Sequence, residues 1–257
     1  MLAKKPAEAL EVFKDLWQRE PQNSYAVRGI VRSYQALEKL PEAVPLLNQY
    51  LEKHPQSSSA TYGLGYVLYL QGKLEESRNI LKEGLKFDPE NALALNNLAA
   101  VLAEMKEYPD ALKTVKQAIN ITPDELMFYR NLQMIYNSAG QPARFVEEYR
   151  HFIAEGPLEQ AKRYGLVLGQ QLRQKSFKLY VDDNIDETIK TIGEMLDIYR
   201  EINHEPGIVA GLFSLAVLYE EQGRLELALE HYREVLKINP QHIQAREKAR
   251  SLGPKKD

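Results

Sequence analysis

Apolar and small side chains recur along this chain at spacings typical of amphipathic helices, and the whole arrangement repeats every 34 residues. The clearest markers of the repeat are five equally spaced prolines, namely Pro21, Pro55, Pro89, Pro123 and Pro157. A fixed period of this length is typical of stacked repeats, each of which forms one supersecondary unit. With the proline at position 32, the pattern predicts repeats at 24–57, 58–91, 92–125, 126–159 and, anchored by Pro240, 209–242.

Two helices are predicted in each repeat. In the first, helix A, positions 7 and 11 are about one turn apart and therefore share an apolar face. Position 7 holds Ile30, Leu64, Leu98, Leu132 and Leu215, and position 11 holds Tyr34, Leu68, Leu102, Tyr136 and Tyr219. In the second, helix B, positions 24 and 27 continue the apolar stripe, as in Leu47 and Tyr50.

Small residues and turn residues support this helix pair. Position 8 of helix A and position 20 of helix B are mostly small, as in Gly65 and Ser77, which lets two helices approach closely. The departures are Gln133 and Phe145. The proline is expected to end helix B, because the residue before a proline avoids the helical region. Glycine at position 15 provides a permissive end for helix A, at Gly72, Gly140 and Gly223.

This pattern resembles the tetratricopeptide repeat family, and the resemblance covers nearly the whole chain. It implies an all-α fold, a right-handed α-solenoid of antiparallel helix pairs with helix A on the concave face and helix B on the convex face. Independently of the family, a unit of two amphipathic helices cannot cover its own apolar face. Stacking of successive repeats is therefore expected to bury it.

Residues 160–208 depart from the period. Within them, Thr188, Ile192 and Met195 match positions 20, 24 and 27 of helix B. The segment resembles the longer repeat of kinesin light chains, and it predicts extra turns in both helices. Residues 243–257 are expected to form a capping helix and a tail, with the helix stopped at Gly253 and Pro254.

Residues 1–23 match helix B without a preceding helix A, so the apolar stripe of residues 7–20 is expected to be partly uncovered. A truncated chain, a helix supplied by a partner and self-association each explain this pattern. One hypothesis is that the half repeat promotes homodimeric contacts.

No apolar core of a signal peptide follows Met1, but trimming of a leader would leave the same sequence. Both a cytoplasmic and a periplasmic location therefore stay open.

Charge and composition narrow the classes of partner. The chain has 33 Lys and Arg against 36 Asp and Glu, a net charge of −3, so no global positive field attracts nucleic acid. No apolar run approaches the ~20 residues of a membrane-spanning helix. The absence of cysteine excludes disulfides and thiolate chemistry. We therefore expect a protein partner, no nucleic acid and no membrane span.

No catalytic or metal-binding constellation is recognised, so neither an enzyme nor a cofactor is expected. Asp182, Asp183 and Asn184 lack the spacing of a calcium loop and are predicted to form a polar turn. Adjacent carboxylates such as Glu220 and Glu221 point about 100° apart on a helix and cannot flank one substrate. Five histidines form no metal-binding pair and are predicted to lie at the surface: His54, His151, His204, His231 and His242.

The concave face is the candidate binding site. Positions 2, 5, 6, 9, 12 and 13 of helix A are expected to project into it, which predicts a lining of Arg28, Arg32, Tyr62, Tyr66, Tyr69, Asn96, Asn97, Arg130, Asn131 and Asn137. Tyrosine offers a large contact area at small entropic cost, and arginine binds carboxylates through two hydrogen bonds. Tyrosines that pack on neighbouring helices, and an inert solvated groove, are the two other interpretations.

Asn97 and Asn131 both occupy position 6 and are expected to form successive rungs along the groove. The family resemblance implies that asparagines here hold the backbone of an extended peptide, since an amide offers both donors and an acceptor. The carboxylate clamp of chaperone-binding members is not matched, because its slots hold residues such as Gly63 and Leu93. A chaperone tail is therefore not the expected ligand.

These observations predict a non-enzymatic scaffold that captures an extended or helical segment of a partner protein in a groove of tyrosine, asparagine and arginine. A structural assembly subunit that self-associates or docks through its ends and convex face is the alternative. A third interpretation is that the chain forms the regulatory arm of a longer enzyme.

Overall fold

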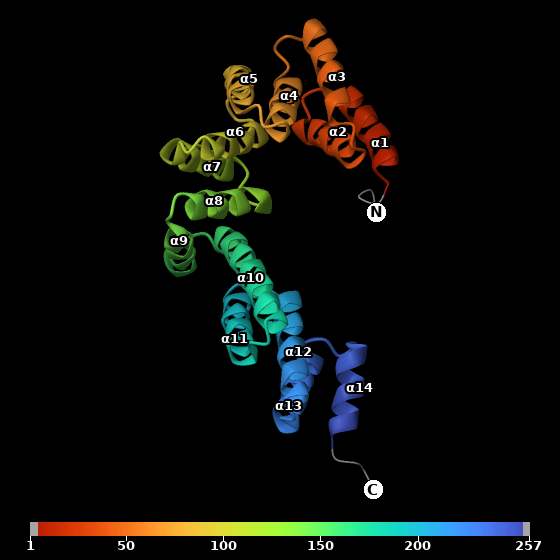
Figure 1. The fold of residues 1–257 in the computed structure, drawn as a ribbon, viewed down its shortest axis with the longest axis vertical. Helices are drawn as coiled ribbons and strands as arrows, with labels where there is room; N and C mark the ends of the chain where they lie inside the picture. Colours follow the sequence, from red (N-terminus) through yellow and green to blue (C-terminus); the bar gives the residue numbers. More distant parts are fainter. Residues whose placement is uncertain (1–4, 254–257) are drawn as a thin grey trace. The chain divides into compact units, whose positions relative to one another are not determined.

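The computed structural model describes residues 5–253, and within this range the chain forms fourteen α-helices and no strand (Figure 1). The expected all-α fold is confirmed. The helices divide into two compact units, Met1–Phe145 and Val146–Asp257, which we call unit 1 and unit 2. The boundary between them falls inside helix α9 (Pro142–Glu155).

Unit 1 alternates helices of type B and type A, beginning with a helix of type B. Neighbouring helices along the chain pack against each other, and each helix A also contacts the next helix A. The helices are α1 (Pro6–Arg19), α2 (Ser24–Ala36), α3 (Leu40–Lys53), α4 (Ser58–Leu70), α5 (Leu74–Phe87), α6 (Ala92–Glu104), α7 (Tyr108–Ile121) and α8 (Leu126–Ser138).

The crossing of helix A and helix B depends on the small residues that the sequence pattern identified. Ser77 on α5 is fully buried, and its hydroxyl donates to the carbonyl of Gly65 on α4 at 2.7 Å. A Cβ atom added to Gly65 would lie 2.6 Å from Leu81 Cγ, which is closer than side chains tolerate. The backbones can therefore approach this closely only because position 8 of the repeat is small.

Helix ends follow the proline and turn pattern. Where a repeat carries the proline, its helix B ends two residues before it, as α3 does at Lys53 before Pro55. Each turn from helix A to helix B contains one residue with positive φ, for example Gly72 with +75°. In unit 1 these residues recur every 34 positions, although two of them, Glu38 at +59° and Lys106 at +64°, are not glycine.

The starts of α2, α4 and α6 are fixed by capping residues that the sequence pattern did not reveal. Asn23, Ser57 and Asn91 lie directly before α2, α4 and α6, again 34 residues apart. Their side chains accept hydrogen bonds from the backbone N–H three residues later, at 3.0, 3.3 and 3.0 Å. Such caps satisfy donors that the first turn of a helix leaves free.

Unit 2 contains the enlarged repeat. Helix α10 (Leu158–Val181) has 24 residues and helix α11 (Ile185–Glu201) has 17, so both helices of residues 160–208 are longer than their counterparts. Thr188, Ile192 and Met195 are buried, as the alignment with helix B predicted. The remaining helices are α12 (Glu205–Glu221), α13 (Leu225–Ile238) and α14 (Ile243–Leu252). Helix α14 stops before Gly253, and Pro254 lies outside the described residues.

Two glycine substitutions test this packing. Gly193 lies inside α11, where a Cβ would meet no atom within 4 Å, so Gly193→Ala should raise the free energy of unfolding by about 0.5–1 kcal/mol. Gly65→Ala should lower it by about 1–3 kcal/mol, because the new methyl group collides with Leu81. Urea unfolding followed by circular dichroism measures both changes. Equal effects would contradict the close crossing.

Candidate functional site

The N-terminal ends of the A helices gather at one place in unit 1. Asn91, the capping residue of α6, donates from Nδ2 to the hydroxyl of Ser24 on α2 at 2.8 Å. The same nitrogen donates to the hydroxyl of Ser58 on α4 at 2.9 Å. The N-terminal ends of three successive A helices are therefore linked through one amide.

The fourth A helix, α8, also reaches this region. The guanidinium of Arg28 on α2 donates to Met127 Sδ on α8 at 2.8 Å. The Tyr25 hydroxyl on α2 donates to the carboxylate of Glu125, which precedes α8, at 3.4 Å. These contacts join residues about 100 positions apart. Tyr25 and Met127 were missed as candidates, although both occupy position 2 of their repeats, one of the positions expected to face the groove.

The ten predicted groove residues occupy three different settings. Three are buried: Tyr62, Asn96 and Asn97. Four are half-buried: Arg28, Tyr66, Tyr69 and Asn131. Three are exposed: Arg32, Arg130 and Asn137. The expected lining is therefore covered in its central part, where the A helices approach one another closely.

Asn96 and Asn131 are bonded to each other. Asn131 Nδ2 donates to Asn96 Oδ1 at 2.9 Å, and Asn96 is 1% exposed. This bond links α6 and α8. In this structure Asn131 thus contributes to the packing of unit 1, in addition to any contact with a ligand.

Two buried donors, one on α4 and one on α6, lack a partner among the described residues. The hydroxyl of Tyr62 and Nδ2 of Asn97 make no hydrogen bond within the described part of the chain. Burial raises the pKa of Tyr62 well above its usual 10.0, and the nearby Arg28 and Asn97 only partly oppose this rise. The hydroxyl therefore stays protonated and remains a donor. Tyr66 stacks on the Tyr62 ring, with centroids 6.2 Å apart.

All five histidines were expected at the surface. His54 and His151 are exposed, whereas His204, His231 and His242 are half-buried. His204 Nδ1 accepts from the N–H of Gly207 at the start of α12, and His242 Nδ1 accepts from the N–H of Ala245 at the start of α14. These two histidines are helix caps. Among the described residues, no group of three His, Cys, Asp or Glu is placed to hold a metal ion.

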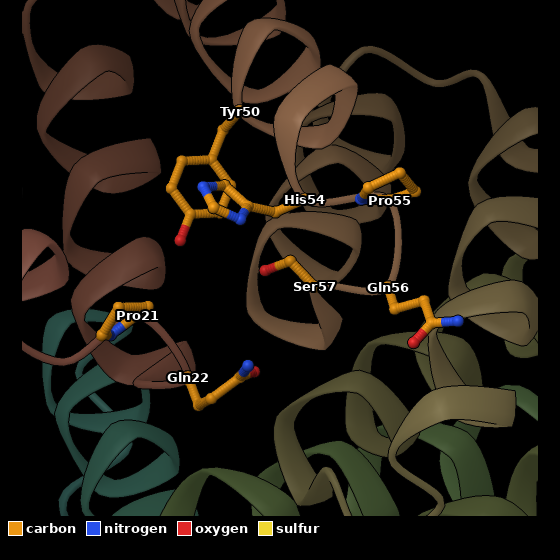
Figure 2. A pocket seen from close by; sticks show the side chains of 7 residues that line it. All are labelled: Pro21, Gln22, Tyr50, His54, Pro55, Gln56 and Ser57. Atoms are coloured by element: carbon orange, nitrogen blue, oxygen red, sulfur yellow. The ribbon is translucent and has the colours of Figure 1, made fainter.

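A cavity of about 640 Å³ lies between two interhelix turns of unit 1 (Figure 2). Pro21 and Gln22 lie on one side of it, and the rings of Tyr50 and His54 lie close together on the other, with centroids 4.5 Å apart. Ser57, a buried polar residue of the lining, is already engaged as the cap of α4. We therefore assign no binding role to this cavity.

Family models of the tetratricopeptide repeat match residues 1–65, 65–106, 91–122 and 209–242. Taken together, these matches span more than half of the chain. The chain belongs to the tetratricopeptide repeat family. Proteins of this family are interaction scaffolds that typically bind peptides and typically lack enzymatic activity, so the family membership points to a protein partner.

Solved structures with a similar fold include one chain of the APC/C hetero-tetramer Cut9-Hcn1. It has a TM-score of 0.51 and 14% identity over 98% of this chain and 54% of that chain. A monomeric IFIT1 mutant with m7Gppp-AAAA has a TM-score of 0.51 and 14% identity over 91% of this chain and 58% of that chain. This tetratricopeptide repeat chain thus spans just over half the length of these structures, and the likeness shows the fold alone. A comparison with curated proteins found no match.

No described helix is long and apolar enough to cross a membrane.

The hydrogen bond between Asn131 and Asn96 predicts that two asparagines of α8 contribute differently to the free energy of unfolding. Asn131→Ala leaves the buried oxygen of Asn96 without a donor and should lower the free energy of unfolding by about 1–3 kcal/mol. Asn137→Ala, at an exposed position of the same helix, should change it by less than about 0.5 kcal/mol. Urea unfolding checks both values, and equal losses would contradict the role of this bond.

The cap at His204 predicts a pH dependence of stability. Nδ1 accepts a hydrogen bond only when it is unprotonated, and burial lowers the pKa of His204 below its usual 6.5. The stabilisation is therefore complete above pH 6.5 and is lost as the pH falls through the lowered pKa of the folded state. His204→Asn keeps a cap that does not titrate, so its thermal midpoint should fall less than that of the wild type between about pH 7 and pH 5. Identical pH profiles would refute this.

Proposed function

We propose that the A-helix face of unit 1 binds a segment of a partner protein, and that hydrogen-bond acceptors of this segment pair with the donors that the fold leaves free. The centre of the proposed site is formed by Arg28, Tyr62 and Asn97. The other seven predicted groove residues belong to the same proposed site, and the exposed Arg32, Arg130 and Asn137 would meet the parts of the segment that reach beyond the centre.

The buried, unpaired donors of Tyr62 and Asn97 carry this proposal. A buried donor without an acceptor costs about 1–3 kcal/mol, and more than about 90% of buried polar groups in proteins are paired. An exception of this kind requires an explanation, such as a ligand atom that completes the pair. A carbonyl or carboxylate oxygen accepts from both a hydroxyl and an amide nitrogen, and a peptide segment supplies such oxygens.

Arg28 strengthens the preference for a carboxylate. Its guanidinium is half-buried and donates to the sulfur of Met127, which is a weak acceptor. A carboxylate oxygen forms a charge-assisted bond that is about twice as strong as a neutral one. A ligand carboxylate is therefore expected to displace Met127 as the partner of Arg28.

Access to the centre requires a small opening between α2 and α8. The bond between Tyr25 and Glu125 that joins these helices is long, at 3.4 Å, and both groups lie near the surface. Little hydrogen-bond energy is lost when such a contact opens. The stacked rings of Tyr62 and Tyr66 then provide an aromatic wall for side chains of the bound segment.

The matched substitutions Tyr62→Phe and Tyr129→Phe test the proposal. Tyr62→Phe removes an unpaired hydroxyl, so it should leave the free energy of unfolding unchanged or slightly raised while it weakens peptide binding about fivefold. Tyr129 is also buried, but its hydroxyl donates to the carbonyl of Pro123 at 2.7 Å. Tyr129→Phe should therefore lower stability and leave binding unchanged.

Peptides for this measurement are selected on the wild-type protein from a phage-displayed library of random sequences, and their affinities are measured by fluorescence anisotropy. Enriched peptides that carry an acidic residue and bind less tightly to Tyr62→Phe support the proposal. It is overturned if no peptide is enriched, if the selected peptides bind both proteins equally, or if Tyr62→Phe destabilises the fold as much as Tyr129→Phe.

A further inference from the structure

Unit 2 carries a second concave surface, between α10 and α12, which we call the α10–α12 groove. It encloses about 350 Å³, and its apolar lining comes from Phe177, Ile192, Phe213, Val217 and Leu218. Its two helices are joined directly, because the Tyr180 hydroxyl on α10 donates to the carboxylate of Glu221 on α12 at 3.3 Å. The groove lies within one unit and uses none of the residues of the proposed site in unit 1.

Large apolar side chains are exposed to solvent in this groove and beside it. Phe177 is 69% exposed and Val181, one turn later on α10, is 65% exposed. Helix α9 packs near the start of α10, where Phe152 stacks on Tyr164 with centroids 5.2 Å apart. Phe177 lies more than three turns beyond that contact, in the additional length of the enlarged helix. Clustered exposed apolar residues of this kind mark interaction surfaces.

The charges along the groove are arranged with opposite signs at its two ends. Glu221 lines one end, and a neighbouring cavity of about 480 Å³ at this end is also lined by Asp183. Arg173 lines the groove seven residues before Tyr180 on α10, about 10 Å away along the helix axis. Among the residues that the structure describes, no ion pair involves any of these three charged side chains.

The C-terminal ends of α10 and α12 add negative charge at the end of the groove where Glu221 lies. Helix α10 ends at Val181 and α12 ends at Glu221, so the C-terminal ends of two helices meet beside the Glu221 carboxylate. The C-terminus of a helix carries a partial negative charge that favours cations nearby. A cation of a bound segment is therefore favoured at this end, and a carboxylate is favoured near Arg173.

We propose that the α10–α12 groove binds an amphipathic helix of a partner protein, which presents apolar side chains one turn apart to Phe177 and Phe213. An acidic residue near the N-terminal end of this helix faces Arg173, and a basic residue near its C-terminal end faces Glu221 and Asp183. The groove between two helices has the shape that receives the ridge of a third. The order of charges also sets the direction of the bound helix, parallel to α10.

Two synthetic peptides test the proposal. Both carry leucines one turn apart and a hydrocarbon staple that holds them helical, and they have the same composition. The first has glutamate at the N-terminal end and lysine at the C-terminal end, and the second has these two residues exchanged. Fluorescence anisotropy with the full chain should show the first peptide binding about tenfold more tightly than the second.

Four variants assign the contacts. Phe177→Ala should weaken binding of the first peptide about tenfold or more, while Phe87→Ala, at another exposed aromatic residue 47% accessible on α5, should leave it unchanged. Glu221→Gln should reduce the difference between the two peptides to about threefold or less. Tyr62→Phe should have no effect, which separates this groove from the proposed site in unit 1. Circular dichroism of each variant confirms that the helices are retained.

The proposal is overturned if the two peptides bind equally, if neither binds, or if Phe177→Ala and Phe87→Ala have the same effect. Light scattering provides a further outcome. A mass of the wild type that rises with concentration, and that returns to one chain in Phe177→Ala, would show that a second copy covers the groove and would contradict binding of a partner helix.

Discussion

The close crossing of the two helices in each repeat is the constraint on which the rest of the structure depends. Ser77 donates to the carbonyl of Gly65 on the neighbouring helix, so the two backbones lie close together. The fully buried Ala43, Ala111 and Ala228 occupy the same repeat position as Ser77. Because these residues are small, helix A and helix B of these repeats can approach each other closely. Successive pairs can then stack and bury the apolar faces that one pair leaves open.

In unit 1 this stacking brings the N-terminal ends of the A helices together. The amide of Asn91 binds both Ser24 and Ser58, and α8 joins through Met127. The same convergence buries Tyr62 and Asn97, whose donors have no acceptor among the described residues. Such unpaired groups reduce stability, and proteins keep such local costs mainly where function requires them. In the proposed site, acceptors of a bound segment pair with these donors.

Unit 2 departs from this geometry because its A helices are longer. The 24 residues of α10 carry Phe177 far beyond the contact of α9 with Tyr164, so an apolar face stays exposed beside α12. The two surfaces then differ in chemistry. The proposed site in unit 1 offers hydrogen-bond donors and an arginine, whereas the α10–α12 groove offers apolar contacts with a carboxylate at one end and an arginine at the other. We therefore propose that the two units bind different kinds of protein segment.

The sequence by itself determined the helices, their proline-defined ends, the small residues at Gly65 and Ser77 and the longer helices of residues 160–208, because each depends on spacings within one repeat or between neighbouring positions. Only the tertiary structure decided which groove residues are covered, that Asn131 is bonded to Asn96, and that Arg28 meets Met127. Arg28 and Met127 are 99 positions apart. Their distance depends on the small rotations between successive repeats added over several repeats, and no local pattern in the sequence records that sum.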